Sequence, residues 1–236
     1  MTNPLLQLTN VSGGYKKGEK ILHDICLTVS KGEAVGIIGL NGSGKSTLGK
    51  AMMNLLPYRS GDISFDGKLL NGRKTHEISR SGMTMMKQGG IVFENLTVLE
   101  NIQLAFERNK DAADKERLFS MIPFLADQSK AHLMANRLSG GERQALSLAM
   151  TLASSPQLVI LDEPSAGLSP MDVESTFLLL QRIRDEFGTA IVLIEQNITR
   201  AVSFCDRCIL LESGRAISEH CDKNIKTIEK QLFKNT

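Results

Sequence analysis

The segment from Gly39 to Thr47 constrains this chain more than any other. It reads Gly-Leu-Asn-Gly-Ser-Gly-Lys-Ser-Thr and matches the Gly-x4-Gly-Lys-Ser/Thr pattern, in which the backbone N–H groups of a glycine-rich turn converge on phosphates. Such a turn needs a strand before it and a helix after it, because the free N–H groups of the helix complete the anion site. The apolar run Ala34–Ile38 predicts that strand, and we expect a helix from Lys45 to Leu56. The pattern therefore favours an α/β fold with a triphosphate site.

Each position of this P-loop, residues Gly39–Thr47, has an expected role. The amine of Lys45 can reach the β- and γ-phosphates, the hydroxyl of Ser46 can ligate Mg²⁺, and Thr47 can touch the α-phosphate. The residues that we expect to bind ATP here are Gly39, Asn41, Gly42, Ser43, Gly44, Lys45, Ser46 and Thr47.

A pair of carboxylates follows a second apolar run, Leu158–Leu161. Asp162 and Glu163 then stand at the carboxyl end of a buried strand, which is where ligands bind in open α/β sheets. We expect Asp162 to hold Mg²⁺ through water and Glu163 to orient and deprotonate an attacking water. Two acids on a surface turn are the alternative, and the P-loop makes that alternative the weaker one.

Composition limits the class of protein. The chain has 236 residues, of which 42% are hydrophobic and 23% charged, as in a globular protein with one large domain or a core with an inserted subdomain. A net charge of +2, with scattered Lys and Arg, does not indicate nucleic-acid binding. No secretory signal and no apolar run of about 18 residues is visible, so we expect action from the water side through a partner.

The remaining patterns predict how the chain is organised. Apolar periodicity predicts strands at Leu5–Val11, Ile25–Val29, Asp62–Phe65, Ala190–Ile194, Cys208–Glu212 and Ala216–Ser218, and a helix after Pro170 that Gly188 closes. Helical patterns without a clear buried strand occur at Val98–Arg108, Ala112–Met121 and Gly141–Ala153. We therefore expect residues 88–155 to form a helical subdomain inserted into an α/β core of residues 1–87 and 156–236. Near the C-terminus, Ile225, Ile228 and Leu232 predict a short amphipathic helix.

Cysteine spacing gives little support for a metal site. Cys205, Cys208, His220 and Cys221 could be imagined as zinc ligands, but structural zinc sites usually have two well-spaced pairs. We interpret these thiols, with Cys26, as reduced.

The sequence from Leu138 to Gln144, Leu-Ser-Gly-Gly-Glu-Arg-Gln, resembles the signature of ABC-type ATPases. With the P-loop and the Asp162–Glu163 pair, the whole chain resembles an ABC transporter nucleotide-binding subunit. The resemblance implies a P-loop NTPase core of the α/β class, with an antiparallel β subdomain and an inserted helical subdomain. The serine and two glycines that open a helix agree with a second anion-binding N-terminus.

The resemblance also implies partners. A second copy or a paralogue would pack head to tail, so that Ser139, Gly140 and Gly141 of one subunit close over ATP held by the P-loop of the other. The dimer would move integral-membrane permease subunits and would lie in the cytoplasm, peripheral on the inner face of the cell membrane.

Further positions match the family pattern. Tyr15 lies where an aromatic ring stacks on adenine. Gln88 lies where the family has a glutamine that senses Mg²⁺ and the attacking water and couples them to the membrane subunit. Residues from Gln88 to Glu100 would form the nearby surface that receives the permease.

Two departures narrow the resemblance. Gln196 replaces the usual switch histidine. Ser169 stands where the family commonly has an acidic residue that makes a contact across the dimer, and the substitution argues against that contact in this chain. A glutamine amide can donate a hydrogen bond to the γ-phosphate but cannot carry a proton. Together with the Lys-Gln-Gly-Gly-Ile-Val-Phe-Glu-Asn-Leu-Thr-Val segment, these features resemble an ATPase of the branched-chain amino-acid importer subfamily. Related importers carry amides or urea, and a solute-binding protein would act indirectly.

Two alternatives stay open. A lipid or lipopolysaccharide exporter ATPase is disfavoured because its usual histidine is missing. A regulatory module that binds ATP without turnover is disfavoured by the intact Lys45, Asp162, Glu163 and Ser139.

Overall fold

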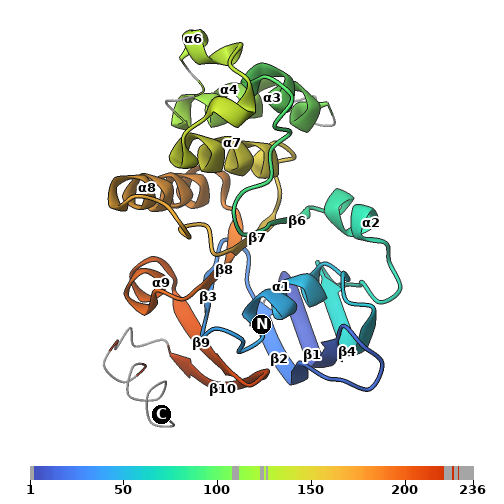
Figure 1. Cartoon of the computed structure of the whole chain (residues 1–236). Helices are drawn as coiled ribbons and strands as arrows, with labels where there is room; N and C mark the ends of the chain where they lie inside the picture. Colours follow the sequence, from blue (N-terminus) through green and yellow to red (C-terminus); the bar gives the residue numbers. More distant parts are fainter. Residues whose placement is uncertain are drawn as a thin grey trace.

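The computed structural model describes residues 3–107, 112–122, 125, 127–220, 225 and 228 (Figure 1). Its central sheet has the strand order β10-β9-β3-β8-β7-β6. The strands are β3 (Ala34–Ile38), β6 (Met83–Met86), β7 (Leu158–Asp162), β8 (Ala190–Glu195), β9 (Arg207–Glu212) and β10 (Arg215–His220). All neighbours pair in parallel except β9 and β10, which form an antiparallel hairpin. Because β3, β7 and β8 are buried at every position, both faces of the sheet must be covered.

A second, antiparallel sheet covers one side of this core. It has the order β2-β1-β4-β5, with β1 at Leu6–Gly14, β2 at Leu22–Val29, β4 at Tyr58–Phe65 and β5 at Lys68–Leu69. Helix α1 (Lys45–Met52) lies between the two sheets (Figure 1). Its Leu48 belongs to one apolar cluster with Val11 of β1 and Ile160 of β7, so α1 joins the two sheets through a shared core.

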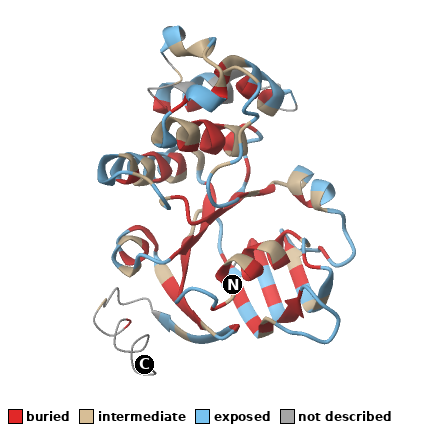
Figure 2. Ribbon diagram, viewed as in Figure 1, coloured by how far each residue is buried: buried red, intermediate tan, exposed pale blue. Residues whose placement is uncertain are grey.

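The helices gather in two groups (Figure 1). Beyond the central sheet lie α3 (Val98–Phe106), α4 (Ala112–Met121), α6 (Gln128–Ala131), the 3₁₀ helix Ala135–Arg137 and α7 (Gly140–Leu152). Closer to the sheet lie α8 (Pro170–Phe187) and α9 (Ile198–Phe204), and α2 (Thr75–Arg80) precedes β6. Figure 2 shows the buried residues following the central strands and the inner faces of these helices.

Most expected elements are present, with shifted ends. The strand Ala34–Ile38 has the bounds that we expected. Helix α8 ends before Gly188 as expected and begins at Pro170 itself, whereas α1 ends at Met52 rather than Leu56. Strand β6 was not expected, because Met-Thr-Met-Met lacks the run of branched residues that marks a buried strand. Helices α2 and α9, which are six and seven residues long, were not expected either.

Parts of the prediction stay open. Arg108, at the end of one expected helix, and Leu232, in the expected C-terminal helix, lie outside the described residues. Ile225 and Ile228 are helical, and Ile228 is fully buried in the core cluster. The division of the chain at residues 88 and 155 stays a prediction. Among the helices of the described residues, none is both long and apolar enough to cross a membrane.

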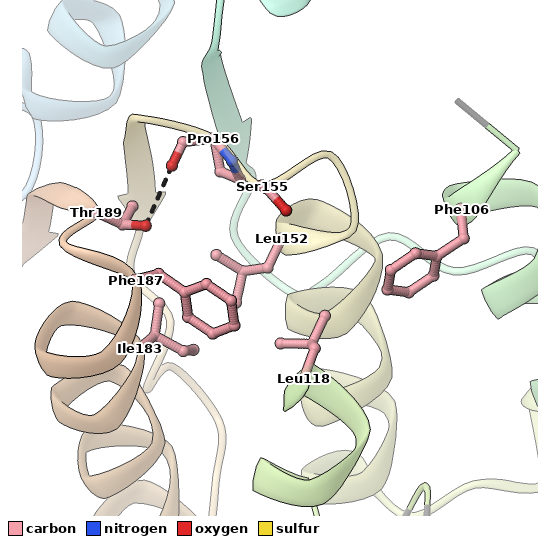
Figure 3. A pocket seen from close by; sticks show the side chains of 8 residues that line it. All are labelled: Phe106, Leu118, Leu152, Ser155, Pro156, Ile183, Phe187 and Thr189. Atoms are coloured by element: carbon pink, nitrogen blue, oxygen red, sulfur yellow. Dashed lines mark hydrogen bonds between the residues drawn. The ribbon is translucent and has the colours of Figure 1, made fainter. Parts of the chain in front are cut away.

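The helical group packs against α8 through apolar side chains. Figure 3 shows Leu118 of α4, Leu152 of α7, and Ile183 and Phe187 of α8 around a hollow of about 10 Å³. At its edge, the Thr189 hydroxyl donates a hydrogen bond of 3.1 Å to the Pro156 carbonyl oxygen. The contact therefore combines close apolar packing with a hydrogen bond between the two polar groups at its edge.

Leu152 and Leu178 provide a matched test of this packing. The Leu152 side chain is 5% exposed, whereas Leu178 on α8 is 62% exposed. We expect Leu152→Ala to lower the free energy of unfolding by about 2–5 kcal/mol, because the deletion leaves a cavity. Leu178→Ala should change it by about 0.5 kcal/mol or less. Urea unfolding measures both, and equal losses in the two variants would contradict the packing described.

Candidate active site

The candidate site lies at the carboxyl ends of three parallel strands. The P-loop follows β3, Asp162 ends β7 with Glu163 directly after it, and Gln196 follows β8. In the strand register, Ile38 pairs with Glu195 and Asp162 pairs with Ile194, so the three loops leave the sheet at one edge. A cleft of about 490 Å³ opens there, lined by Ile21, Asn41, Gly42, Gly44, Lys45, Ser46, Thr47, Gln88, Glu163 and Gln196.

The P-loop backbone has the shape that an anion site needs. Gly42 and Gly44 have φ angles of 79° and 103°, which favour glycine, and no atom lies within 4 Å of a Cβ built on Gly42. Helix α1 starts at Lys45 without a side-chain cap and without an acidic residue in its first turn. The first N–H groups of α1 therefore face the cleft with the positive end of the helix dipole.

Lys45 is the buried cation of the site. Its side chain is 5% exposed, and its Nζ donates to the carbonyl oxygens of Gly39 at 2.8 Å and Leu40 at 2.9 Å. Burial lowers the pKa of Lys45, while the charges of Glu163 and Asp162 oppose that shift. Among the described residues, no ion pair within 4.0 Å neutralises this ammonium group. A phosphate is the kind of ligand that such a group fits.

An unpaired hydroxyl supports the same fit. Ser43 Oγ is buried and, among the described residues, has no hydrogen-bond partner. A buried polar atom without a partner costs about 1–3 kcal/mol, so a phosphate oxygen at this position would offset that cost. Three features of the P-loop therefore fit a triphosphate: the charge of Lys45, the free N–H groups of α1 and the hydroxyl of Ser43.

Ser46 and Asp162 form a pair of oxygen ligands. Ser46 Oγ donates a hydrogen bond of 2.9 Å to Asp162 Oδ1. Burial raises the pKa of Asp162, and the bond from Ser46 opposes that shift. A hydroxyl and a carboxylate are ligands that Mg²⁺ accepts together with phosphate oxygens and water. The donor set therefore fits the expected metal, with Gln88 close by.

Glu163 is held by two amides. Gln196 Nε2 donates to Glu163 Oε1 at 2.6 Å, and Gln88 Nε2 donates to Oε2 at 3.0 Å. Glu163 has a φ angle of 49° and is 8% exposed. The structure therefore brings together the three residues that we expected to be catalytic, from three different segments of the chain.

Two residues at this site were missed by sequence reasoning. Glu195, 3% exposed, accepts hydrogen bonds from Ser165 Oγ at 2.6 Å and from the Gln196 backbone N–H at 3.2 Å. Glu195 therefore fixes the backbone that carries Gln196. The only feature of the sequence that could have indicated this role is a carboxylate at the end of an apolar strand. Ile21 also lines the cleft, and no motif marks it.

Tyr15 lies beside α1 and outside the lining of the cleft. Its hydroxyl accepts a hydrogen bond of 3.0 Å from Lys50 Nζ, which also lies 5.2 Å from the ring centroid. The ring is 43% exposed, so one face remains open to a flat ligand. Its expected stacking on adenine stays a prediction.

Ser139, Gly140 and Gly141 do not meet the P-loop within one chain. They open α7, and none of them lines the cleft. Ser139 Oγ accepts from the Glu142 N–H at 3.2 Å, which caps the helix. Because this edge belongs to the outer helical group, a shared ATP site requires a second chain.

Ser169, at the position where an acid is common, caps α8. Its Oγ accepts from the Asp172 N–H at 3.3 Å and donates to Asp172 Oδ2 at 2.7 Å. A helix cap thus accounts for this serine within one chain.

The cysteines give no metal centre among the described residues. Cys205 and Cys208 are buried beside Gly36, and the hydrogen bond with Cys208, together with burial, raises the pKa of Cys205. No group of three or more candidate ligands occurs in the described part of the chain. Cys221 and the His220 side chain lie outside it.

Known proteins resemble this chain over most of its length. A model of the ABC transporter family matches residues 22–166. The high-affinity branched-chain amino acid transport ATP-binding protein BraG of Pseudomonas aeruginosa is 36% identical, covering 90% of this chain and 91% of that protein. The probable branched-chain amino acid transport ATP-binding protein LivF of Archaeoglobus fulgidus is 35% identical over 89% of each. The lipopolysaccharide export system ATP-binding protein LptB of Escherichia coli is 29% identical, covering 90% and 89%.

Solved structures share the fold. The ADP conformation of MJ1267, an ATP-binding cassette of an ABC transporter, has a TM-score of 0.83 at 25% identity and covers 99% of this chain and 98% of its own. The dimeric post-hydrolysis structure of the ATP-binding cassette MJ0796 with ADP and Pi has a TM-score of 0.79 at 27% identity, covering 91% and 97%.

Gly214, in the turn between β9 and β10, allows a test of how the P-loop is supported. Its N–H donates to the Ser43 carbonyl oxygen at 2.9 Å, its φ is 74°, and a Cβ there would overlap the Ile21 carbonyl oxygen. Gly67 has a φ of 73° with no atom within 4 Å of such a Cβ. We expect Gly67→Ala to cost about 1–2 kcal/mol of backbone strain alone.

Gly214→Ala should cost more than Gly67→Ala and should also weaken binding of Mg-ATP, because it displaces Ile21 and the P-loop. Urea unfolding and titration with a fluorescent ATP analogue measure the two effects. Equal ATP affinity in the two variants would show that this turn does not support the P-loop.

Proposed function

Because this chain belongs to the ABC transporter family of ATPases, we propose that it is the ATP-hydrolysing subunit of an importer for branched-chain amino acids or related small polar solutes. The observation that carries the catalytic part is the carboxylate of Glu163, held by two amides at the edge of the P-loop cleft. The substrate class is supported by the similarity to BraG and LivF and by Gln196 in place of a histidine.

The triphosphate would bind along the P-loop. The N–H groups from Gly39 to Thr47 and the ammonium of Lys45 would hold the β- and γ-phosphates, and Ser43 Oγ would gain its missing partner. Tyr15 would stack on the adenine. Ser46, Asp162 and Gln88 would hold Mg²⁺, which supplies neutralisation of phosphate charge.

Glu163 would act as the general base. It would take one proton from a water whose oxygen bonds to the γ-phosphorus, while the bond from that phosphorus to the bridging oxygen of ADP breaks. Each oxygen of Glu163 accepts one amide hydrogen, from Gln88 or from Gln196, and keeps a second lone pair for the water. To reach the γ-phosphate, the amide of Gln196 would have to leave Glu163 Oε1. Gln196 would then donate to the γ-phosphate. This exchange would remove one hydrogen bond from the carboxylate of Glu163 when the nucleotide is bound, which raises its basicity.

The proposed partners follow from the position of Ser139, Gly140 and Gly141, which do not line the cleft of their own chain. Ser139, Gly140 and Gly141 of a second copy or a paralogue would close over the ATP, as the dimeric form of MJ0796 supports. Integral-membrane permease subunits would receive the motion through the surface between Gln88 and Glu100, on the inner face of the membrane. A solute-binding protein would act through the permease.

Lipopolysaccharide export is a second candidate, favoured by the 29% identity to LptB over 90% of this chain. Reconstitution separates the two. Affinity capture from membranes would identify the permease subunits, and phosphate release by the assembly in proteoliposomes would be measured with and without solute. We expect stimulation by a branched-chain amino acid in the presence of its binding protein. Stimulation by lipopolysaccharide instead, or by no such solute, would overturn the importer proposal.

We expect Glu163→Gln to keep ATP affinity and to lower hydrolysis by about 100-fold or more, because the general base is removed while its shape is kept. The variant should also accumulate as a closed dimer with Mg-ATP. Phosphate release and size-exclusion chromatography measure these outcomes. Glu116→Gln, at an exposed position of α4, is the control and should retain the original rate. Hydrolysis by Glu163→Gln at the original rate would place the base elsewhere.

Gln196 allows a test by pH. Gln196→Ala should raise the barrier by about 1–3 kcal/mol through one lost hydrogen bond, a fall of roughly 5- to 150-fold in kcat. A glutamine does not titrate, so Gln196→His should add a pH dependence at about pH 6–7 that the original chain lacks. Gln181→Ala, on exposed α8 surface, is the control. Unchanged rates in Gln196→Ala would remove this residue from the site.

A further inference from the structure

Three consecutive side chains at the start of α7 hold three different segments. Glu142 pairs with Lys130 of α6, and Arg143 contacts Glu94 at 3.5 Å, beyond Gln88 in the chain. The side chains of Lys130 and Glu94 are 36% and 61% exposed, so water screens both pairs. Gln144 differs from these two residues, since it is 6% exposed and its bond points toward the catalytic edge of the sheet.

Gln144 lies between the two segments that carry Gln88 and Glu163. Its Nε2 donates a hydrogen bond of 2.6 Å to the carbonyl oxygen of Pro164, the residue directly after Glu163. On the other side, a Cβ built on Gly90 would lie 2.7 Å from Gln144 Oε1. The side chain is thus packed against residue 90 and bonded to residue 164, within two residues of a hydrogen-bonded catalytic pair.

The turn at Glu163 needs such a support. Glu163 has a φ angle of 49°, in the left-handed region, where a residue with a Cβ is strained and is held by its surroundings. Its N–H donates to the Ile194 carbonyl oxygen at 2.9 Å, which fixes the peptide before it. The bond from Gln144 to the Pro164 carbonyl oxygen fixes the peptide between Pro164 and Ser165, one residue further along the turn. Both groups are buried, so this bond supports the backbone turn that carries Glu163, while Gln88 and Gln196 hold its carboxylate.

We propose that Gln144 is a positioning residue that ties the first turn of α7 to the Glu163 turn and to the segment after Gln88. It does not touch the reacting atoms. The inference rests on the proposed function, because Ser139, at the start of the same helix, would contact the ATP held by the partner chain. Contact at Ser139 then reaches Glu163 of its own chain through one buried side chain, and each of the two sites senses closure of the other.

Gln144→Met tests the hydrogen bond, because methionine has a similar length and no donor. We expect kcat to fall at least 10-fold, with the KM for ATP and the affinity for a fluorescent ATP analogue within 2-fold of the original chain. Gln181→Met on exposed α8 is the matched control. Thermal unfolding of both variants reports whether the fold is retained, and an unchanged kcat in folded Gln144→Met overturns the proposal.

A double-mutant cycle shows whether Gln144 acts through Glu163. In the Glu163→Gln background, Gln144→Met should change the residual hydrolysis by less than 2-fold, because the group that it positions is already absent. A loss as large as in the original chain would mean that Gln144 acts independently of Glu163, which overturns the proposal.

A second variant avoids Gln144 itself. Gly89 and Gly90 have φ angles of 82° and 60°, and only Gly90 would bring a Cβ against Gln144. Gly90→Ala should therefore lower kcat more than Gly89→Ala, with equal ATP affinity in the two. Equal kcat values would contradict the inference. If the unsubstituted chain releases no phosphate from Mg-ATP, the proposed function itself fails. That result can be told apart from the variant comparisons, which all require an active unsubstituted chain.

Discussion

The parallel pairing of β3 with β8 and of β8 with β7 is the constraint on which the rest of the structure depends. Each of these strands is buried at every position, and β7 and β8 end in Asp162 and Glu195, so a slip in register would draw a carboxylate into the apolar sheet and break the packing on both faces. The register sets where each strand ends, and each end carries a functional group. The P-loop, the pair of acids and Gln196 meet for that reason, although they lie far apart in the sequence.

The site that results has an uneven charge distribution. Lys45 is buried with carbonyl oxygens as its hydrogen-bond partners, while burial raises the pKa of Asp162. Ser43 Oγ is buried without a partner in the described part of the chain. A magnesium–triphosphate complex would satisfy all three at once, since it offers anionic oxygens to the first and third and a cation to the second. This need accounts for a polar cleft in an otherwise apolar edge of the sheet.

The helical group adds what the sheet cannot supply. Ser139, which caps α7, does not line the cleft of its own chain. Gln144, five positions later, bonds to the turn after Glu163. Under the proposed function, one helix would therefore present a surface to a second chain and support the base of its own. The apolar contact of Leu152 with α8 holds the far end of that helix, so packing and positioning are properties of the same element (Figure 3).

The sequence by itself determined the P-loop, the acids after β7, the buried strands and most helices, because these features have a local signature: glycines at a turn, a period of hydrophobicity, a run of branched residues. It did not reveal β6, whose four residues are buried by their neighbours in the sheet rather than by a pattern of their own. Only the tertiary structure decided that Gln88 and Gln196 both bind Glu163, that Glu195 holds Gln196, and that Gln144 reaches Pro164. These contacts join residues that are 20 to 75 positions apart, except for the adjacent pair, and they depend on side-chain geometry that forms only when the strands and helices pack together.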